Sequence, residues 1–511
     1  MQRKQLTLVI VSLLVVVLSV SLAYFTAQII GKGKDVSVTS ANLQIVFTDS
    51  DGALTETDIE PGWQKTKTFT IKNDTKTEYK YNIVIKDLLN TFVTEGYLQY
   101  KITSTNNGYN MTEFKDIPKS SAPKDKVLAY SVSIPVGVTQ SYTIEFKYAN
   151  DESVDQSDDM GKKLSGTLFI TEGTEDIYAG YEEGTLGYQI MGDNPTRNTR
   201  DTYDAVFTSN TTGTLFTATE KNVYNTTDTT VYYYAGNTTK NWVKFAGYYW
   251  RIIRTNADGS IRMLYSGTSH VTTSGYLSTG TSEFNTTYNS PKYVGYMYGN
   301  DDSSLLNART NTNNSTIKTA IDNWYASNMT SYTKYLSTTA VYCNDRTEQT
   351  SGTYNTGKTA FYYAPDARAE TNYTPTYDCT EASDAFSGSN TSAKLTYPIA
   401  LMTADEIMRA GGKSNTSLTS PYPWYYLNSA NGSITGSTEW WLLSPSNWNG
   451  NGANVFYVGG SPVLGYLVYN YVNYTGGVLR PALSLKSCVK YSSGDGSASD
   501  PYTIKETTSG C

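Results

Sequence analysis

The chain has 511 residues, too many for one ordinary hydrophobic core, so we expect two or three domains. Its 45 Tyr and 40 Gly, with only 17% charged residues, predict a mostly β protein, because Tyr favours strands and Gly favours turns. A net charge of -7 argues against a nucleic-acid partner, and the single histidine, His270, excludes most Ser-His and Cys-His catalytic sites and His-rich zinc sites.

Residues 1–30 predict an export segment. Arg3 and Lys4 precede an apolar run at 6–23 that contains no charged residue, and small residues near its end offer a cleavage site. The run approaches the length of a membrane span, so a cleaved signal peptide and an uncleaved N-terminal membrane anchor both remain open. In either case we expect the protein outside the cell or on its surface.

Residues 31–176 alternate between polar and apolar side chains in the manner of strands. In the stretch QKTKTFTIKN, Phe69 and Ile71 lie on one face of the predicted strand, and Thr68 and Thr70 lie on the other. Such strands recur at short spacing between the turn sequences EPGW, NNGY and IPVG. This pattern predicts an antiparallel β-sandwich. Residues 177–190 are expected to form a linker to the second half.

The first half resembles the TasA/camelysin family of exported Gram-positive proteins. The resemblance is carried by AYFTAQ directly after the apolar run and by DIEPGWQKTKTFTIKNDTKTEYKYNIVI, which contains the PG followed by a strand that ends in Asn. It implies a β-sandwich placed at the surface of a Gram-positive-type bacterium. It leaves open self-assembly through an exposed strand edge.

The stretch NWVKFAGYYWRIIRTNADGSIRMLYSG predicts a β-hairpin in the second half. Two apolar and aromatic strands flank a DG dipeptide, which supplies the turn. The residues expected in its core are Trp250, Ile252 and Met263. Three arginines on the same strands, Arg251, Arg254 and Arg262, are expected to stay solvated.

Two helices are predicted from apolar spacing and capping residues. STIKTAIDNWYASNM, at 315–329, begins at a Ser or Thr cap and places Ile317, Ile321 and Trp324 on one face. TADEIMRAGG, at 403–412, has the T-x-x-E spacing of a capping box. Its adjacent Asp and Glu point to different sides of a helix, so we interpret them as first-turn capping acids rather than as a catalytic pair.

The four cysteines allow three disulfide pairings in an exported protein. They are Cys343, Cys379, Cys488 and Cys511. The sequential pairing is the simplest hypothesis, and neither pair has the C-x-x-C spacing of redox or zinc sites.

The last part resembles the C-type-lectin-like fold of bacterial surface domains, which also houses formylglycine-generating enzymes. The matching sequences are WWLLSP at 440–445 and GGVLRPAL at 476–483. The resemblance implies a lectin-like domain at 191–486, followed by a C-terminal tail at 487–511. Calcium-dependent members carry E-P-N and W-N-D sequences, whereas here Gly450 follows WN and no E-P-N occurs, so no metal or other cofactor is expected. No reactive cysteine pair matches the enzymes, and we expect no enzymatic activity.

Residues 440–483 also resemble the variable region of receptor proteins diversified by retroelements. From 455 to 475 the chain uses only Val, Phe, Tyr, Gly, Ser, Pro, Leu, Asn and Thr, all encodable by the NNY codons that such diversification produces. The alternative is that two core strands of a low-charge protein lack the other residues anyway. A single sequence leaves both interpretations open.

The tyrosines and asparagines of this region predict a recognition face, because Tyr is rigid, amphipathic and inexpensive to order on binding. Core positions are expected at Val463, Leu464, Leu467, Val468 and Val472. Ligand contacts are expected from Asn447, Trp448, Asn449, Asn451, Phe456, Tyr457, Ser461, Tyr466, Tyr469, Asn470, Tyr471, Asn473 and Tyr474. The ligand would be a protein or glycan on another cell, a phage or a host.

The sequence therefore predicts a mainly β protein with some helix (α+β), made of an N-terminal β-sandwich and a C-type-lectin-like domain. Its predicted function is that of a cell-surface adhesin or receptor. The alternative is a structural subunit of an extracellular fibre.

Overall fold

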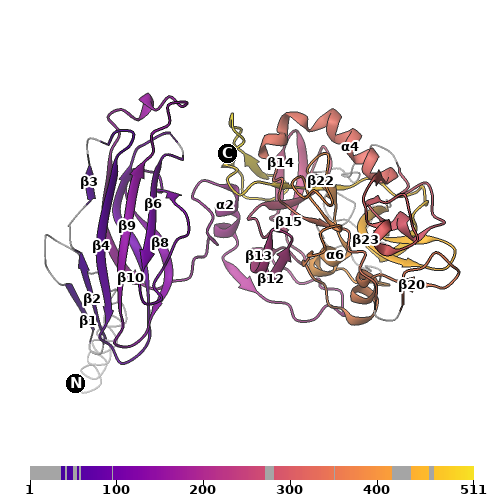
Figure 1. Cartoon of the computed structure of the whole chain (residues 1–511), viewed down its shortest axis with the longest axis horizontal. Coiled ribbons are helices and arrows are strands. Elements are labelled where there is room, and N and C mark those ends of the chain that lie inside the picture. Colours follow the sequence, from indigo (N-terminus) through magenta and orange to yellow (C-terminus); the bar gives the residue numbers. More distant parts are fainter. Residues whose placement is uncertain are drawn as a thin grey trace, which may run out of the picture. The chain divides into compact units, whose positions relative to one another are not determined.

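A computed structural model describes most of the chain (Figure 1). The described residues are 36–40, 43–49, 54–56, 59–94, 96–270, 281–349, 352–416, 439–459 and 465–511. They form mainly strands with a few short helices, which confirms the mostly β, α+β class. The predicted export segment lies outside the described residues, and no helix within them is long and apolar enough to cross a membrane.

The chain divides into two compact units, Met1–Asp176 and Ile177–Cys511. The first unit contains two antiparallel sheets, drawn in indigo and purple in Figure 1. In spatial order, the six-stranded sheet consists of β1 (Val36–Ser40), β2 (Leu43–Asp49), β4 (Gln64–Asn73), β9 (Thr139–Tyr148), β6 (Leu98–Ser104) and β7 (Lys115–Asp116). The four-stranded sheet consists of β3 (Leu54–Glu56), β10 (Leu164–Glu172), β5 (Tyr79–Asn90) and β8 (Ser120–Ile134). A short 3-10 turn, η1, spans Ser157–Asp159.

The two sheets of the first unit share one hydrophobic core. On β4, Phe69 and Ile71 are buried while Thr68 is exposed, so the alternation in the sequence corresponds to an inner and an outer face. Ile71 packs in the same cluster as Ile83 of β5 and Ile144 of β9, all fully buried. This is the packing of a β-sandwich, in which alternate residues of both sheets fill the space between them.

The second unit is built on a branched ten-stranded sheet. Its main path runs β11 (Thr196–Asn198), β12 (Thr214–Asn222), β13 (Asn225–Tyr233), β15 (Tyr248–Thr255), β14 (Trp242–Phe245), β28 (Tyr502–Ile504) and β27 (Tyr491–Ser493). From β15 it branches through β16 (Ile261–Tyr265) and β26 (Pro481–Leu485) to β22 (Ile399–Leu401). The expected tail therefore differs from the structure, because 487–511 supplies two strands of this sheet. Residues 177–190, expected as a linker, also belong to this unit, since Leu186 is fully buried in its core.

A four-stranded sheet and several short elements complete the second unit. The sheet has the order β20 (Phe361–Tyr362), β23 (Trp440–Trp448), β24 (Ala453–Val458) and β25 (Leu467–Tyr471). Two short pairs are β17 (Met297–Tyr298) with β18 (Asn313–Asn314) and β19 (Tyr342–Cys343) with β21 (Ala385–Phe386). The helical elements are α2 (Leu186–Asp193), η2 (Pro291–Val294), α3 (Leu305–Ala308), α4 (Thr316–Asn328), η3 (Thr330–Tyr335), α5 (Ala364–Asp366), the π-type turn η4 (Ala367–Asn372) and α6 (Ala404–Ala410).

Both predicted helices are present. Helix α4 is capped by Ser315, whose side chain accepts a hydrogen bond from the N–H of Lys318, and its predicted apolar face is buried. Helix α6 has the predicted capping box between Thr403 and Glu406, and it ends at Gly411, whose φ of 119° lies in the left-handed region. The cysteines pair sequentially, Cys343 with Cys379 and Cys488 with Cys511.

The expectation that the hairpin arginines stay solvated is wrong. Arg251, Arg254 and Arg262 are 1%, 3% and 1% exposed, because β15 and β16 are covered on both faces. Such burial is tolerable only with partners close by. Arg251 donates from Nε to Asn241 over 2.7 Å and stacks on Trp242. Arg254 and Arg262 instead form ion pairs with carboxylates.

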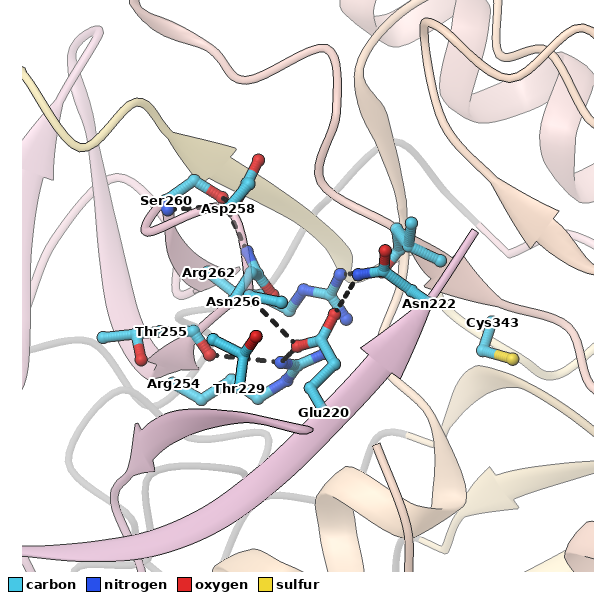
Figure 2. A network of polar contacts seen from close by, with 12 residues as sticks. Glu220, Asn222, Thr229, Arg254, Thr255, Asn256, Asp258, Ser260, Arg262 and Cys343 are labelled. Carbon is cyan, nitrogen blue, oxygen red and sulfur yellow. Dashed lines mark hydrogen bonds and ion pairs between the residues drawn. The ribbon is translucent and has the colours of Figure 1, made fainter. Parts of the chain in front are cut away.

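A buried charge network holds Arg254 and Arg262. Arg254 donates to Glu220 over 2.5 Å and to Glu406 over 3.0 Å, and Arg262 donates to the same Glu406 oxygen over 2.6 Å. Figure 2 shows the Glu220 carboxylate between the Arg254 guanidinium and the Asn222 amide. The two arginines hold the pKa of Glu406 below its ordinary value against the opposing effect of burial. Glu406, the capping residue of α6, thus also balances the positive charges of Arg254 and Arg262 inside the large sheet.

Candidate functional site

The predicted recognition region forms part of the four-stranded sheet, in which β25 is an edge strand among the described strands. The register pairs Tyr469 with Phe456, Tyr471 with Asn454, Asn454 with Asn447, and Asn447 with Tyr362. Residues paired across neighbouring strands share one face of a sheet. Side chains from all four strands therefore meet on a single face.

Four exposed tyrosines gather here, and we call them the tyrosine face. Tyr288, Tyr362, Tyr469 and Tyr471 are 41%, 41%, 40% and 38% exposed. They are four of the five exposed tyrosines among the described residues, the fifth being Tyr224. Tyr288 reaches the sheet from outside: its carbonyl accepts a hydrogen bond from the N–H of Ala453, and its ring meets that of Tyr471 edge-on at 5.9 Å between centroids. Aromatic exposure is thus concentrated rather than scattered.

A chain of polar side chains anchors the centre of this face. Ser446 donates to the Asp366 carboxylate over 2.8 Å, and the Asn447 amide donates to Ser446 over 2.8 Å. The Asn454 amide donates to Asn447 over 2.9 Å. Tyr469 lies beside this chain through its register with Phe456, and its ring meets that of Phe456 edge-on at 6.1 Å between centroids. Because these groups are mutually satisfied, the inner strands that support Tyr469 are held in one arrangement before any ligand arrives.

The turn between β23 and β24 fixes Tyr471. The Asn449 carbonyl oxygen accepts the N–H groups of Asn451 and Gly452, and its amide donates to the Tyr471 hydroxyl over 2.8 Å. Lys358 donates to Asn451 over 2.9 Å at the exposed rim. These side chains leave amide groups beside the aromatic rings, where a ligand could use them for hydrogen bonds.

Two carboxyl groups lie next to Tyr469. Asp366 ends α5 and Glu370 lies four residues later in η4. Burial raises the pKa of Asp366 to about 6, and Glu370 adds to this rise. Burial also raises the pKa of Tyr469, with further contributions from Asp366, Tyr362 and Glu370. The aromatic rings on this side therefore lie in a negative electrostatic environment.

The opposite face of the sheet also carries predicted contact residues. Tyr457 and Tyr474 are half-buried against Trp441, with ring centroids 5.9 and 6.3 Å from it. Asn470 and Asn473 are half-buried as well, and Asn470 accepts the N–H of Tyr471 over 2.8 Å. Because β25 separates them from the tyrosine face, one small ligand could not contact both sets.

Some predicted contact residues are buried. Asn447 and Trp448 are each 3% exposed and Phe456 is fully buried, because β23 and β24 are the inner strands of the sheet. Asn447 and Phe456 lie beneath the tyrosine face instead of reaching a ligand, whereas Trp448, the next residue of β23, belongs to the opposite face. Tyr466 is half-buried and donates to Asn415, while Ser461 lies outside the described residues.

The predicted core positions of the same region differ among themselves. Leu467 and Val472 are fully buried, as expected. Val468 is only half-buried, because it lies on an edge strand. Val463 and Leu464 lie outside the described residues.

Sequence reasoning missed half of the tyrosine face and both carboxyl groups. Tyr288, Tyr362, Asp366 and Glu370 come from segments that lie 70 or more residues before β23 in the chain. Only strand register and the packing of α5 on β23 bring them here. Local patterns in the sequence do not predict contacts between segments so far apart in the chain.

The second unit also contains a small cavity. It is lined by ion-paired side chains, among them Arg262 and Glu406 of the buried network and Arg368, which pairs with Asp345 and Asp405. The positive and negative side chains that line the cavity form ion pairs with one another, which is typical of a cluster that stabilises the fold rather than of a binding site. Among the described residues, no group of three or more His, Cys, Asp and Glu side chains could hold a metal ion.

Comparisons with known proteins leave the family open. No protein-family profile matches the chain, and no curated protein matches it. Among solved structures, a ruminal GH26 endo-beta-1,4-mannanase aligns with 11% sequence identity over 29% of this chain and 28% of its own, with a TM-score of 0.15. The chain thus spans under a third of that enzyme, and a likeness this weak supports no statement about fold or activity.

Proposed function

We propose that this protein is an exported cell-surface adhesin or receptor whose ligand binds to the tyrosine face. The observation that carries the proposal is the concentration of exposed tyrosine on one sheet face, where four of the five exposed tyrosines of the described residues lie. Contact surfaces of this kind draw most of their binding energy from a few aromatic side chains.

The construction of the face supports binding. Tyr469 packs edge-on against the buried Phe456, and the Tyr471 hydroxyl accepts a hydrogen bond from Asn449, so binding loses less side-chain entropy at these two rings. Ring faces offer apolar contact, while hydroxyl and amide groups offer hydrogen bonds. The ligand class that fits is a protein or glycan with both apolar and polar groups on its surface.

The remaining parts of the proposal follow the sequence resemblances. The first unit would hold the protein at the surface of a Gram-positive-type bacterium, and the second would be a C-type-lectin-like domain. If residues 440–483 are diversified by a retroelement, the changes would fall on β25 and the adjoining turns, since β23 is buried throughout. A near-copy of their codons beside a reverse transcriptase gene would support this part, and its absence would remove it.

The test is binding of the labelled full-length protein to candidate bacterial and host cells. Replacing both Tyr469 and Tyr471 with Ala should weaken binding roughly 30-fold, as expected for the loss of two central aromatic contacts. Tyr224→Ala is the matched control, because Tyr224 is 43% exposed but lies outside the face. Equal binding by the double variant and the wild type would contradict the proposal.

The alternative is a structural fibre subunit, and the sheets of the first unit are consistent with it. Within the described residues both sheets are open, so each has two edge strands that a second copy could extend. Electron microscopy of the purified full-length chain distinguishes the two functions. Regular filaments that persist in the Tyr469→Ala/Tyr471→Ala variant, without any cell binding, would favour the fibre.

A further inference from the structure

Asp366 is exceptional among the buried acids of the second unit. Six acidic side chains are buried in the described part of this unit: Glu220, Asp322, Asp366, Asp384, Asp405 and Glu406. Five of them form ion pairs with Arg or Lys at 2.5–3.0 Å. Asp366, 6% exposed, forms no ion pair with a described residue. It accepts hydrogen bonds from neutral groups, Ser446 over 2.8 Å and Gln349 over 3.4 Å.

A second carboxylate nearby also lacks a described counter-ion. Glu370 is half-buried and accepts hydrogen bonds from the Ser414 hydroxyl and the Asn415 amide, both neutral. Ser446, which donates to Asp366, precedes Asn447, the register partner of Tyr362. Ser414, which donates to Glu370, also donates to the carbonyl of Leu467, two residues before Tyr469 on β25. These contacts bring the four side chains to one part of the sheet. We call this group the acidic corner of the tyrosine face.

Burying charge without a counter-ion is unfavourable, and the five other buried acids of the described part of this unit avoid it. The corner combines this unbalanced negative charge with two exposed tyrosines, Tyr362 and Tyr469. A cation placed against such rings is attracted by their π electrons and by the carboxylates at the same time. Arginine is the best-matched side chain, because its planar guanidinium stacks on aromatic rings and donates in a fork to carboxylates.

We propose that the acidic corner, formed by Tyr362, Asp366, Glu370 and Tyr469, binds an arginine side chain of a protein ligand. This inference rests on the proposed binding function and specifies the ligand chemistry. The ligand cation would occupy the place that an arginine of the chain itself occupies beside each of Glu220, Asp384, Asp405 and Glu406. The remaining tyrosines, Tyr288 and Tyr471, would then contact apolar parts of the same ligand.

The probe is a matched pair of small molecules, N-acetylarginine methylamide and N-acetylcitrulline methylamide. Citrulline has nearly the same shape but no charge. Ligand-observed NMR titration with the full-length chain at pH 7.5 should give a dissociation constant about five- to tenfold lower for the arginine compound, the range expected for a cation against rings and carboxylates. Equal affinity for the two compounds would overturn the inference.

Variants locate the effect. Glu370→Gln and Tyr469→Leu should each reduce the preference for arginine toward one, and both change partly exposed side chains, so the fold should persist. Glu381→Gln, which removes an exposed acid elsewhere in the unit, should leave the preference unchanged. A preference that survives Glu370→Gln and Tyr469→Leu would place the cation elsewhere and overturn the assignment.

The two proposals fail separately. If Tyr469→Ala/Tyr471→Ala abolishes cell binding but arginine is not preferred over citrulline, only the cation assignment is wrong. If the double variant binds cells normally, the binding function itself is wrong.

Discussion

Glu406 and Asp366 are both buried acids in the second unit, yet their surroundings differ completely. Glu406, 1% exposed, accepts from two arginines and closes the capping box of α6. Asp366, 6% exposed, accepts hydrogen bonds from two described donors, Ser446 and Gln349, and both are neutral. Their pKa values shift in opposite directions, downward for Glu406 and upward to about 6 for Asp366. A buried carboxylate that is ion-paired within the chain stabilises the fold. A buried carboxylate without a counter-ion destabilises it, and a cationic ligand could supply that counter-ion.

The largest expected effect on stability is at Glu406. Glu406→Gln leaves Arg254 and Arg262 without their shared carboxylate and weakens the cap of α6, so unfolding of the second unit should become easier by about 3–5 kcal/mol. Urea unfolding followed by Trp fluorescence measures this change. Glu381→Gln should change the free energy of unfolding by less than about 0.5 kcal/mol. A loss at Glu406 no larger than this control would mean that the network is not stabilising.

A smaller effect of opposite sign is expected at Asp366. Since its folded pKa of about 6 lies above the ordinary value, the unfolded chain releases this proton first, and its contribution to stability falls as the pH rises from about 4 to 6. Asp366→Asn removes the ionised form and should stabilise the second unit by roughly 1–2 kcal/mol at pH 7.5, and by much less at pH 4. Thermal unfolding at the two pH values tests this. Destabilisation at pH 7.5 would show that a counter-ion is present after all.

The elements that the sequence predicts are those determined by local pattern. Alternation around Phe69 and Ile71 predicts the strand β4 and its buried face, and Ser315 and Thr403 mark where two helices begin. These features depend on residues only a few positions apart, so composition and spacing suffice. The sequential disulfide pairing is also the simplest arrangement along the chain.

The features that the sequence does not predict depend on distant contacts. Arg254 and Glu406 are 152 residues apart, and nothing in the hairpin indicates that a carboxylate will cover it. Phe456 and Tyr469 both look like contact residues in a low-charge stretch, but β24 is an inner strand and β25 an edge strand, so one is buried and the other exposed. Tyr362 joins the face only through its register with Asn447.

The central claim is that a ligand covers the tyrosine face, and hydroxyl-radical footprinting of the full-length protein on cells that it binds tests this claim directly. Oxidation of Tyr288, Tyr362, Tyr469 and Tyr471 should fall severalfold on binding, because these exposed rings become covered, while oxidation of Tyr224 should stay unchanged. Protection of Tyr224 with continued oxidation of the four face tyrosines would contradict the account.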